Sequence, residues 1–326
     1  VWWYDHVTHT LSATIVAAAG YVVARAVDET SDDVYLPPRF MFVFVLLFTL
    51  GLGVVWEVLE FFARLGAELL GLDPVLVQYG LEDTLLDLLF DTLGAVLVAA
   101  FGTGTITGVV ASVADRLAER RTGRDSPRVD HARAGVAGLE RVVRSAPSHA
   151  RVAWLLTGVL SVAVVAGLLA GAVLSSLLVA VVVALAVVPA VATRDPAAML
   201  PWPLLTAAGL PVLGGVVARP WLASGPITYF AVATIALVVA VELHLFTPVR
   251  MTPGFAVGFV VVTTVGVAGV WAVGRWLVDL TFGTELLLVA GRTDAEVETR
   301  LMWEFVASAA AGLVAGATFE WGFRRR

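Results

Sequence analysis

The chain has 326 residues, of which 59% are hydrophobic and 15% are charged, and its mean hydropathy is +0.89. Soluble domains average about 45–50% apolar and about 25% charged residues, and they still need a polar surface, so this composition excludes an ordinary soluble protein. The absence of cysteine excludes disulfides and thiolate metal sites, and the net charge of −6 argues against a nucleic-acid partner.

Apolar segments long enough to cross a lipid bilayer recur along the whole chain. A spanning helix needs about 20 mostly apolar residues. Nine segments meet this requirement: 7–27, 40–65, 84–106, 152–172, 174–193, 199–218, 227–247, 254–280 and 298–322. The sequence therefore predicts an all-α, polytopic transmembrane bundle of nine helices, with a tight turn near Leu174–Ser176. Because the chain opens on Val1 and aromatic residues, we expect it to begin inside a longer protein.

The arginine-rich segment 115–150 predicts the orientation of the protein in the cell membrane. Nine arginines fall between Arg116 and Arg151, and the positive-inside rule places such a linker in the cytoplasm. Counting spans from there puts the N-terminal end outside and the C-terminus in the cytoplasm. Residues 136–144 fit either a helix on the membrane surface or a flexible linker. The domains predicted are a three-helix unit (1–114), this linker, and a six-helix unit (151–326).

A weak similarity between the two halves indicates a degenerate parallel internal repeat. The motif Thr-x-Gly-x-x-x-Val-Trp occurs at Thr49–Trp56 and again at Thr264–Trp271. Chance similarity between valine-rich helices is the alternative. In this alignment the i, i+4 pair of Glu60 and Arg64 reappears with its signs reversed as Arg275 and Asp279, and the second pair is expected to be structural.

Ionisable side chains gather in the first three predicted spans, where such residues are costly and point to function. The first span carries Asp5, His6 and His9, of which Asp5 and His9 share a face one turn apart. The second carries Glu57, Glu60 and Arg64. The third carries Glu82, Asp83, Asp87 and Asp91, with the last three on one helix face. Consecutive helices joined by short loops pack side by side, so these groups are expected to converge near the outer face.

A divalent metal ion is the expected cofactor of this cluster, because clustered carboxylates repel one another without a cation. Imidazole and carboxylate ligands suit zinc, iron or manganese. The predicted metal ligands are His6, His9, Glu57, Glu60, Asp83, Asp87 and Asp91, and the predicted catalytic residues are His9, Glu57 and Asp87. The alternative is a set of interface charges solvated by lipid headgroups and water. At the inner end of the seventh span, Glu242 and His244 are expected to snorkel to the interface.

Residues 4–100 resemble the YjdF-type inner-membrane proteins and, more distantly, the VanZ-like proteins. The motifs that carry this resemblance are Tyr4-Asp5-His6-x-x-His9, Trp56-Glu57-x-x-Glu60-Phe61-Phe62 and Gln78-x-Gly80-x-x-Asp83-x-x-x-Asp87. His6 is an addition to the family pattern, and an apolar pair, Leu85-Leu86, replaces a polar position. The resemblance implies a site at His9, Glu57, Glu60, Asp83 and Asp87, but no established reaction.

Three functions fit these observations. The first is an outward-facing, metal-dependent membrane enzyme acting on a lipid or lipid-linked headgroup. The second is a proton- or cation-coupled transporter that uses the carboxylates as a relay. The third is a structural or accessory subunit that packs against other membrane subunits. The sequence favours the first, because few polar residues continue across the spans toward the inner face.

Overall fold

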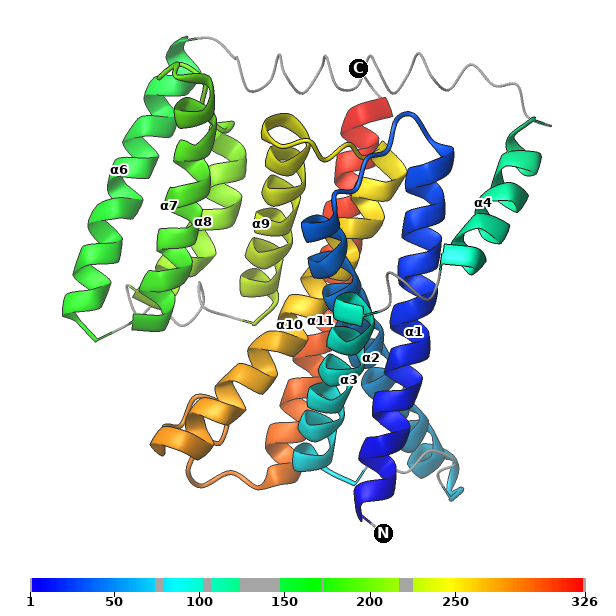
Figure 1. Cartoon of the computed structure of the whole chain (residues 1–326). Helices are drawn as coiled ribbons and strands as arrows, with labels where there is room; N and C mark the ends of the chain where they lie inside the picture. The colour runs from blue at the N-terminus through cyan, green and yellow to red at the C-terminus, as the bar shows by residue number, and fades with distance from the viewer. Residues whose placement is uncertain are drawn as a thin grey trace. The chain divides into compact units, whose positions relative to one another are not determined.

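A computed structural model describes residues 2–73, 79–101, 107–122, 147–171, 173–216 and 225–324. This part of the chain forms ten α-helices and no β-strand (Figure 1). The helices are α1 (Trp2–Thr30), α2 (Pro38–Leu70), α3 (Leu81–Phe101), α4 (Thr107–Thr122), α6 (Pro147–Leu169), α7 (Val173–Thr193), α8 (Trp202–Val216), α9 (Gly225–Phe246), α10 (Pro253–Phe282) and α11 (Asp294–Arg324).

Six of the described helices are long and apolar enough to cross a membrane. They contain the segments Tyr4–Thr30, Pro38–Leu70, Leu81–Phe101, Ala150–Leu169, Ser176–Thr193 and Gly254–Phe282. In α9 the apolar stretch among the residues whose side chains are described, Ala231–Leu243, is shorter. The prediction of an all-helical, multi-pass membrane protein is therefore confirmed, whereas the count of nine spans is not.

Local sequence signals explain where the long helices begin and end. Pro37 and Pro38 open α2, where a proline costs no intrahelical hydrogen bond. Gly71 closes it in the left-handed region at φ 66°, and Leu72 N–H donates back to Ala67 O at 2.9 Å. The start of α11 is a capping box, in which Thr293 and Glu296 exchange hydrogen bonds between side chain and backbone.

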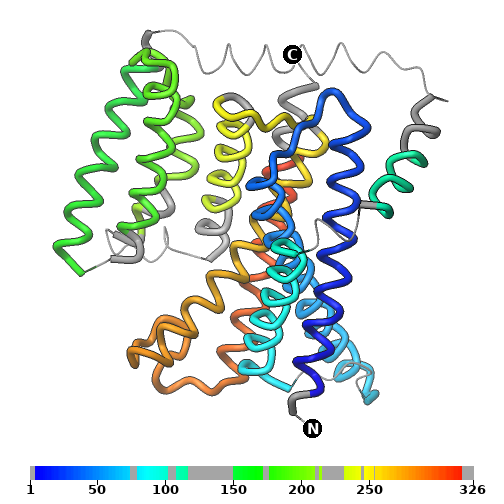
Figure 2. Tube along the Cα trace, viewed as in Figure 1, coloured from blue at the N-terminus to red at the C-terminus, as the bar shows by residue number. Residues whose placement is uncertain are grey.

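The chain folds into two compact units, and each unit is built from two segments that are separated in the sequence. The first comprises 1–124 and 262–310, and the second comprises 125–261 and 311–326 (Figure 2). In the first unit α1 packs against α3, and α2 packs against both. Its core joins α2 and α3 to the parts of α10 and α11 that belong to the unit, through Phe61, Leu85, Leu88, Trp276, Leu301 and Phe305.

Helices α6, α7, α8 and α9 pack together in the second unit. Their core is aliphatic, with Leu160, Val179, Val182, Leu205 and Val238 among its buried members. The turn between α6 and α7 was predicted near Leu174–Ser176, but it lies earlier, where Gly171 adopts φ 79°. Ser176 is fully buried inside α7, which begins at Val173, one residue before the predicted span.

Two other predictions differ from the structure or fall outside it. The third predicted span extended to residue 106, whereas α3 ends at Phe101 and the separate helix α4 contacts α1. The predicted surface helix at 136–144, with most of the arginine-rich linker, lies outside the described residues. Snorkelling is wrong for Glu242, because its side chain is buried with only 7% exposed.

Candidate functional site

Helices α1 and α3 approach closely enough to bring the two polar stripes of the sequence together. A Cβ atom placed on Gly94 would lie 2.6 Å from Thr10 O and 2.9 Å from Ala13 Cβ, so only glycine fits this crossing. One turn toward the start of both helices, the histidines of α1 face the aspartates of α3. The close contact therefore positions the cluster.

Imidazoles and carboxylates alternate along this interface. Asp87 is buried, and its two oxygens face two histidines: His6 Nδ1 lies 3.5 Å from Oδ1, and His9 Nε2 lies 3.6 Å from Oδ2. The other ring nitrogen of His9, Nδ1, lies 3.4 Å from Oδ1 of Asp91. These separations exceed those of strong charge-assisted hydrogen bonds, which are about 2.7–2.9 Å. The side chains are therefore oriented toward one another without being tightly hydrogen bonded.

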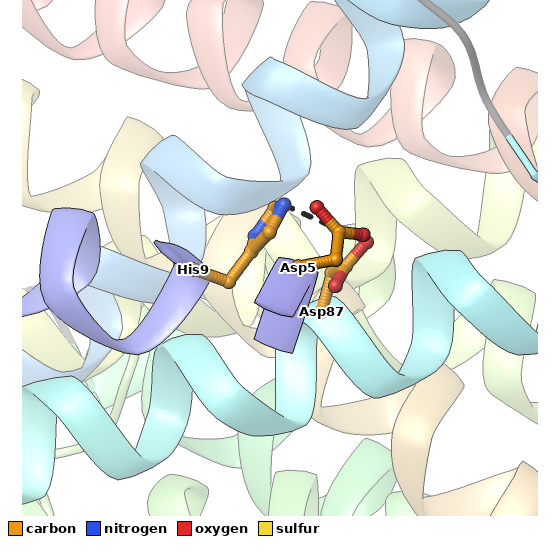
Figure 3. Close-up of side chains that lie close together, drawn as sticks. All are labelled: Asp5, His9 and Asp87. Atoms are coloured by element: carbon orange, nitrogen blue, oxygen red, sulfur yellow. Dashed lines mark ion pairs between the residues drawn. The ribbon is translucent and has the colours of Figure 1, made fainter. Parts of the chain in front are cut away.

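Asp5 joins His9 and Asp87, and these three side chains lie close enough together to hold a metal ion. Asp5, His9 and Asp87 each offer one ligand atom, and these atoms lie within 4.8 Å of one another. Asp5 and His9 come from adjacent turns of α1, Asp87 comes from α3, and all three point toward a common centre (Figure 3). Around an octahedral ion with ligands at 2.0–2.1 Å, adjacent ligand atoms are about 3 Å apart and only opposite ones are about 4.2 Å apart. At most one of the three pairs can lie across the ion, so separations of up to 4.8 Å place the ligand atoms near one another without forming a coordination shell.

Glu57 of α2 forms the third side of the cluster. Its side chain is 2% exposed, and Oε2 accepts a hydrogen bond of 2.8 Å from the hydroxyl of Thr84, which is fully buried on α3. Asp87 and His9 lie within range of electrostatic interaction with this carboxylate. Glu57 is therefore a buried acid that is hydrogen bonded to Thr84 and lies beside the group formed by Asp5, His9 and Asp87.

The remaining predicted ligands lie around this centre. Glu60 is partly buried and accepts a hydrogen bond of 2.8 Å from Trp56 Nε1. Asp83 interacts electrostatically with Asp5, His6 and His9. The structure thus brings His6, His9, Glu57, Asp87 and Asp91 into the cluster, and leaves Glu60 and Asp83 at its edge.

Both predicted i, i+4 ion pairs are wrong. Arg64 pairs with Glu298 of α11 at 2.8 Å, not with Glu60. Arg275 pairs with Glu304 of α11 at 2.8 Å, and Asp279 instead accepts hydrogen bonds from the loop after α10. Helical spacing identifies only neighbours on one helix, whereas these charges pair between helices.

Sequence reasoning missed three residues that shape the site. Thr84, the donor to Glu57, precedes Asp87 by three residues on the same helix face, which was an available signal. The ring of Phe90 stacks on His6 at a centroid distance of 4.7 Å. A Cβ atom on Gly53 would lie 2.3 Å from Asp91 Oδ2, so α2 touches the cluster at that glycine. No pattern in the sequence indicated the last two contacts.

Comparison with known proteins gives a family description without a function. Residues 1–108 match the family model described as predicted membrane protein (DUF2238), and residues 137–199 match the model described as domain of unknown function (DUF8268). No curated protein and no solved structure matches the chain. Every residue of the cluster lies in the first matched segment, whose model describes a predicted membrane protein.

Proposed function

We propose that the chain is a metal-dependent membrane enzyme whose cluster between α1, α2 and α3 acts on a lipid or lipid-linked headgroup. The convergence of Asp5, His9 and Asp87 within 4.8 Å carries this proposal. Two carboxylates and one imidazole suit zinc, iron or manganese. Three protein ligands also leave positions for water and substrate, as catalytic metal sites require.

The surrounding residues have distinct roles in this proposal. Asp91 faces Nδ1 of His9 and leaves Nε2 directed toward Asp87, the arrangement by which a neighbouring carboxylate orients a metal-binding histidine. Glu57, held by Thr84, serves as the general base. His9 is either a ligand or a proton shuttle. A bound metal supplies an activated water for attack on the headgroup.

The distribution of charge favours an enzyme over a transporter. Between His9 and Arg25, a rise of about 24 Å, α1 carries no acidic, basic or histidine side chain. The same holds for α2 between Arg39 and Glu57 and for α3 after Asp91. The other buried polar side chains of the first unit's described residues in this direction are hydroxyls, at Thr49, Thr263, Thr264 and Ser308. A proton relay across the membrane would need titratable groups along this path.

We also propose that the chain crosses the membrane nine times, that it is related to the YjdF-type proteins, and that it divides into a three-helix unit, a linker and a six-helix unit. In this arrangement the polar cluster faces the outside of the cell. One contact supports the internal repeat. Gly51 and Gly266, which the alignment makes equivalent, lie against each other where α2 crosses α10: a Cβ atom on Gly51 would lie 3.6 Å from Gly266 N. A two-fold relationship between two halves brings equivalent residues together in this way.

Metal analysis of the full chain, purified without chelators, tests the proposed centre. We expect about one zinc, iron or manganese ion per chain, and at least tenfold weaker binding in Asp87→Asn and His9→Gln. Glu82→Gln is the matched control, because Glu82 is an exposed carboxylate on α3 outside the cluster. If wild-type protein contained no more metal than Asp87→Asn and His9→Gln, the proposed metal centre would be rejected.

Headgroup release from vesicles of the total polar lipids of the source organism, followed by mass spectrometry, tests the enzymatic part. Loss of a general base lowers turnover by about 10²–10⁴, so Glu57→Gln is expected to retain metal but lose activity. Glu82→Gln again serves as the control. Full release by Glu57→Gln would exclude this residue as the base, and no release by metal-loaded wild type would favour a binding or structural role.

A further inference from the structure

A second polar site lies where α10 ends and α11 begins, within the first unit. A small hollow that is partly open to solvent is lined by three arginines, Arg275, Arg292 and Arg300, and by one carboxylate, Glu304. These four side chains leave an excess of two positive charges. The hollow lies outside both matched segments and at the same end of the unit as the start of α1 (Figure 1).

Glu304 holds two of the arginines in place without satisfying them. Its Oε2 accepts from Arg275 Nη2 at 2.8 Å, and its Oε1 accepts from Arg300 Nε at 3.2 Å. The Nε of Arg275 is buried, and among the described residues no acceptor is in hydrogen-bonding position for it. A buried donor on a charged group without an acceptor is costly, so this donor favours binding of a further acceptor in the hollow.

The hollow is also preorganised. Asp279 accepts hydrogen bonds of 2.7–2.8 Å from the backbone N–H groups of Leu286, Leu287 and Leu288, which fixes the loop that forms one wall. Leu287, Val297 and Leu301 line the hollow and belong to the core of the unit. An apolar wall strengthens the attraction between the arginines and an anion, because less water screens them.

We propose that this hollow binds a phosphate group carrying two negative charges. Guanidinium groups present planar, paired donors that match phosphate oxygens, and a dianion balances the two excess charges. The phosphate belongs either to a lipid headgroup or to a free solute. Exposed Leu280 and Phe282 at the end of α10 provide apolar surface for acyl chains and favour the lipid.

Binding to the purified full chain in detergent tests this site, with titration calorimetry as the measurement. The probes are inorganic phosphate, dihexanoyl phosphatidic acid and, as a neutral-headgroup reference, dihexanoyl phosphatidylcholine. We expect phosphatidic acid to bind more tightly than phosphatidylcholine. The double variant R292Q/R300Q is expected to weaken that binding at least tenfold, because each arginine contributes charge-assisted hydrogen bonds.

Two variants separate this result from general electrostatics and from misfolding. R39Q/R151Q removes two exposed arginines elsewhere and is expected to bind like wild type. R292K/R300K keeps the charge and is expected to retain part of the affinity.

Binding of inorganic phosphate as tight as that of phosphatidic acid would identify a free anion. The proposal would be overturned if R292Q/R300Q and R39Q/R151Q lost the same affinity for phosphatidic acid. It would also be overturned if wild type bound phosphatidic acid and phosphatidylcholine equally and did not bind phosphate. Metal content is measured in parallel, so this outcome is independent of the metal centre.

Discussion

Asp87 and Asp279 are two buried aspartates of the first unit with opposite surroundings. They are 4% and 5% exposed. Asp279 accepts four hydrogen bonds, from Thr284 Oγ1 at 2.5 Å and from three backbone N–H groups at 2.7–2.8 Å. Asp87 faces two imidazoles at 3.5 and 3.6 Å, and its Oδ1 accepts no hydrogen bond from the described residues.

This difference distinguishes a structural carboxylate from one that is available to a ligand. Buried polar groups that stabilise a fold are normally hydrogen bonded, and Asp279 follows this rule by anchoring the loop after α10. A carboxylate kept in a membrane helix without such partners destabilises the fold unless it binds something else.

The largest expected effect on the free energy of unfolding comes from replacing each of the two aspartates by asparagine. Asp279→Asn should lower the free energy of unfolding by about 3 kcal/mol, because several buried donors lose a charged acceptor. Asp87→Asn should leave metal-free protein as stable as wild type or more stable, because it removes a poorly hydrogen-bonded carboxylate. Unfolding in mixed SDS and detergent micelles measures both. Equal losses in the two variants would contradict the distinction.

A smaller effect is expected at Thr84, the one hydrogen-bond donor to Glu57 among the described residues. Thr84→Val keeps the shape of the side chain but removes the hydroxyl, which should cost about 2 kcal/mol because Glu57 is then left buried without a donor. Thr84→Ser keeps the donor and is the control. If valine and serine behave alike in the same unfolding assay, Glu57 does not depend on this bond.

The sequence predicted the polar faces of single helices well, because helical geometry alone determines them. Asp87 and Asp91 were placed on one face of α3, and Asp5 and His9 on one face of α1; the structure has both faces in contact. Hydropathy likewise located the spans in α1, α2 and α3 within a few residues at most ends. These features follow from local periodicity.

Contacts between distant helices were not predictable from spacing. Arg64 and Glu298 are 234 positions apart, and neither carries a signal that selects the other. The fit of Gly53 against Asp91 and the stacking of Phe90 on His6 also depend on how the helices cross. Spacing within one helix therefore offered wrong partners for Arg64 and Arg275, which pair with Glu298 and Glu304 of α11.

Gly53→Ala should disturb the cluster more than the fold. The new Cβ would lie 2.3 Å from Asp91 Oδ2, so Asp91 must rotate away from His9. We expect a stability loss of about 1 kcal/mol, together with weaker metal binding. Gly66→Ala is the matched control on α2, because nothing lies within 4 Å of its Cβ position, and it should be neutral or stabilising. Unchanged metal affinity in Gly53→Ala would show that Asp91 does not orient His9.

The smallest effect is expected at the capping box of α11, where Glu296 is an exposed counterpart of Asp279. The backbone N–H of Thr293 donates to its carboxylate at 2.9 Å and holds the pKa of Glu296 below its usual value. A lowered folded-state pKa means that the carboxylate stabilises the fold above the unfolded-state pKa, and that this contribution disappears as the pH falls through the folded-state value. Wild type should therefore exceed Glu296→Gln slightly in stability at neutral pH, and the two should converge in acid. Glu285 is exposed in the loop before α11, and Glu285→Gln should match wild type in stability at neutral pH.

The stability difference between wild type and Glu296→Gln should disappear below the folded-state pKa. If it persists there unchanged, packing rather than the hydrogen-bonded charge makes Glu296 stabilising.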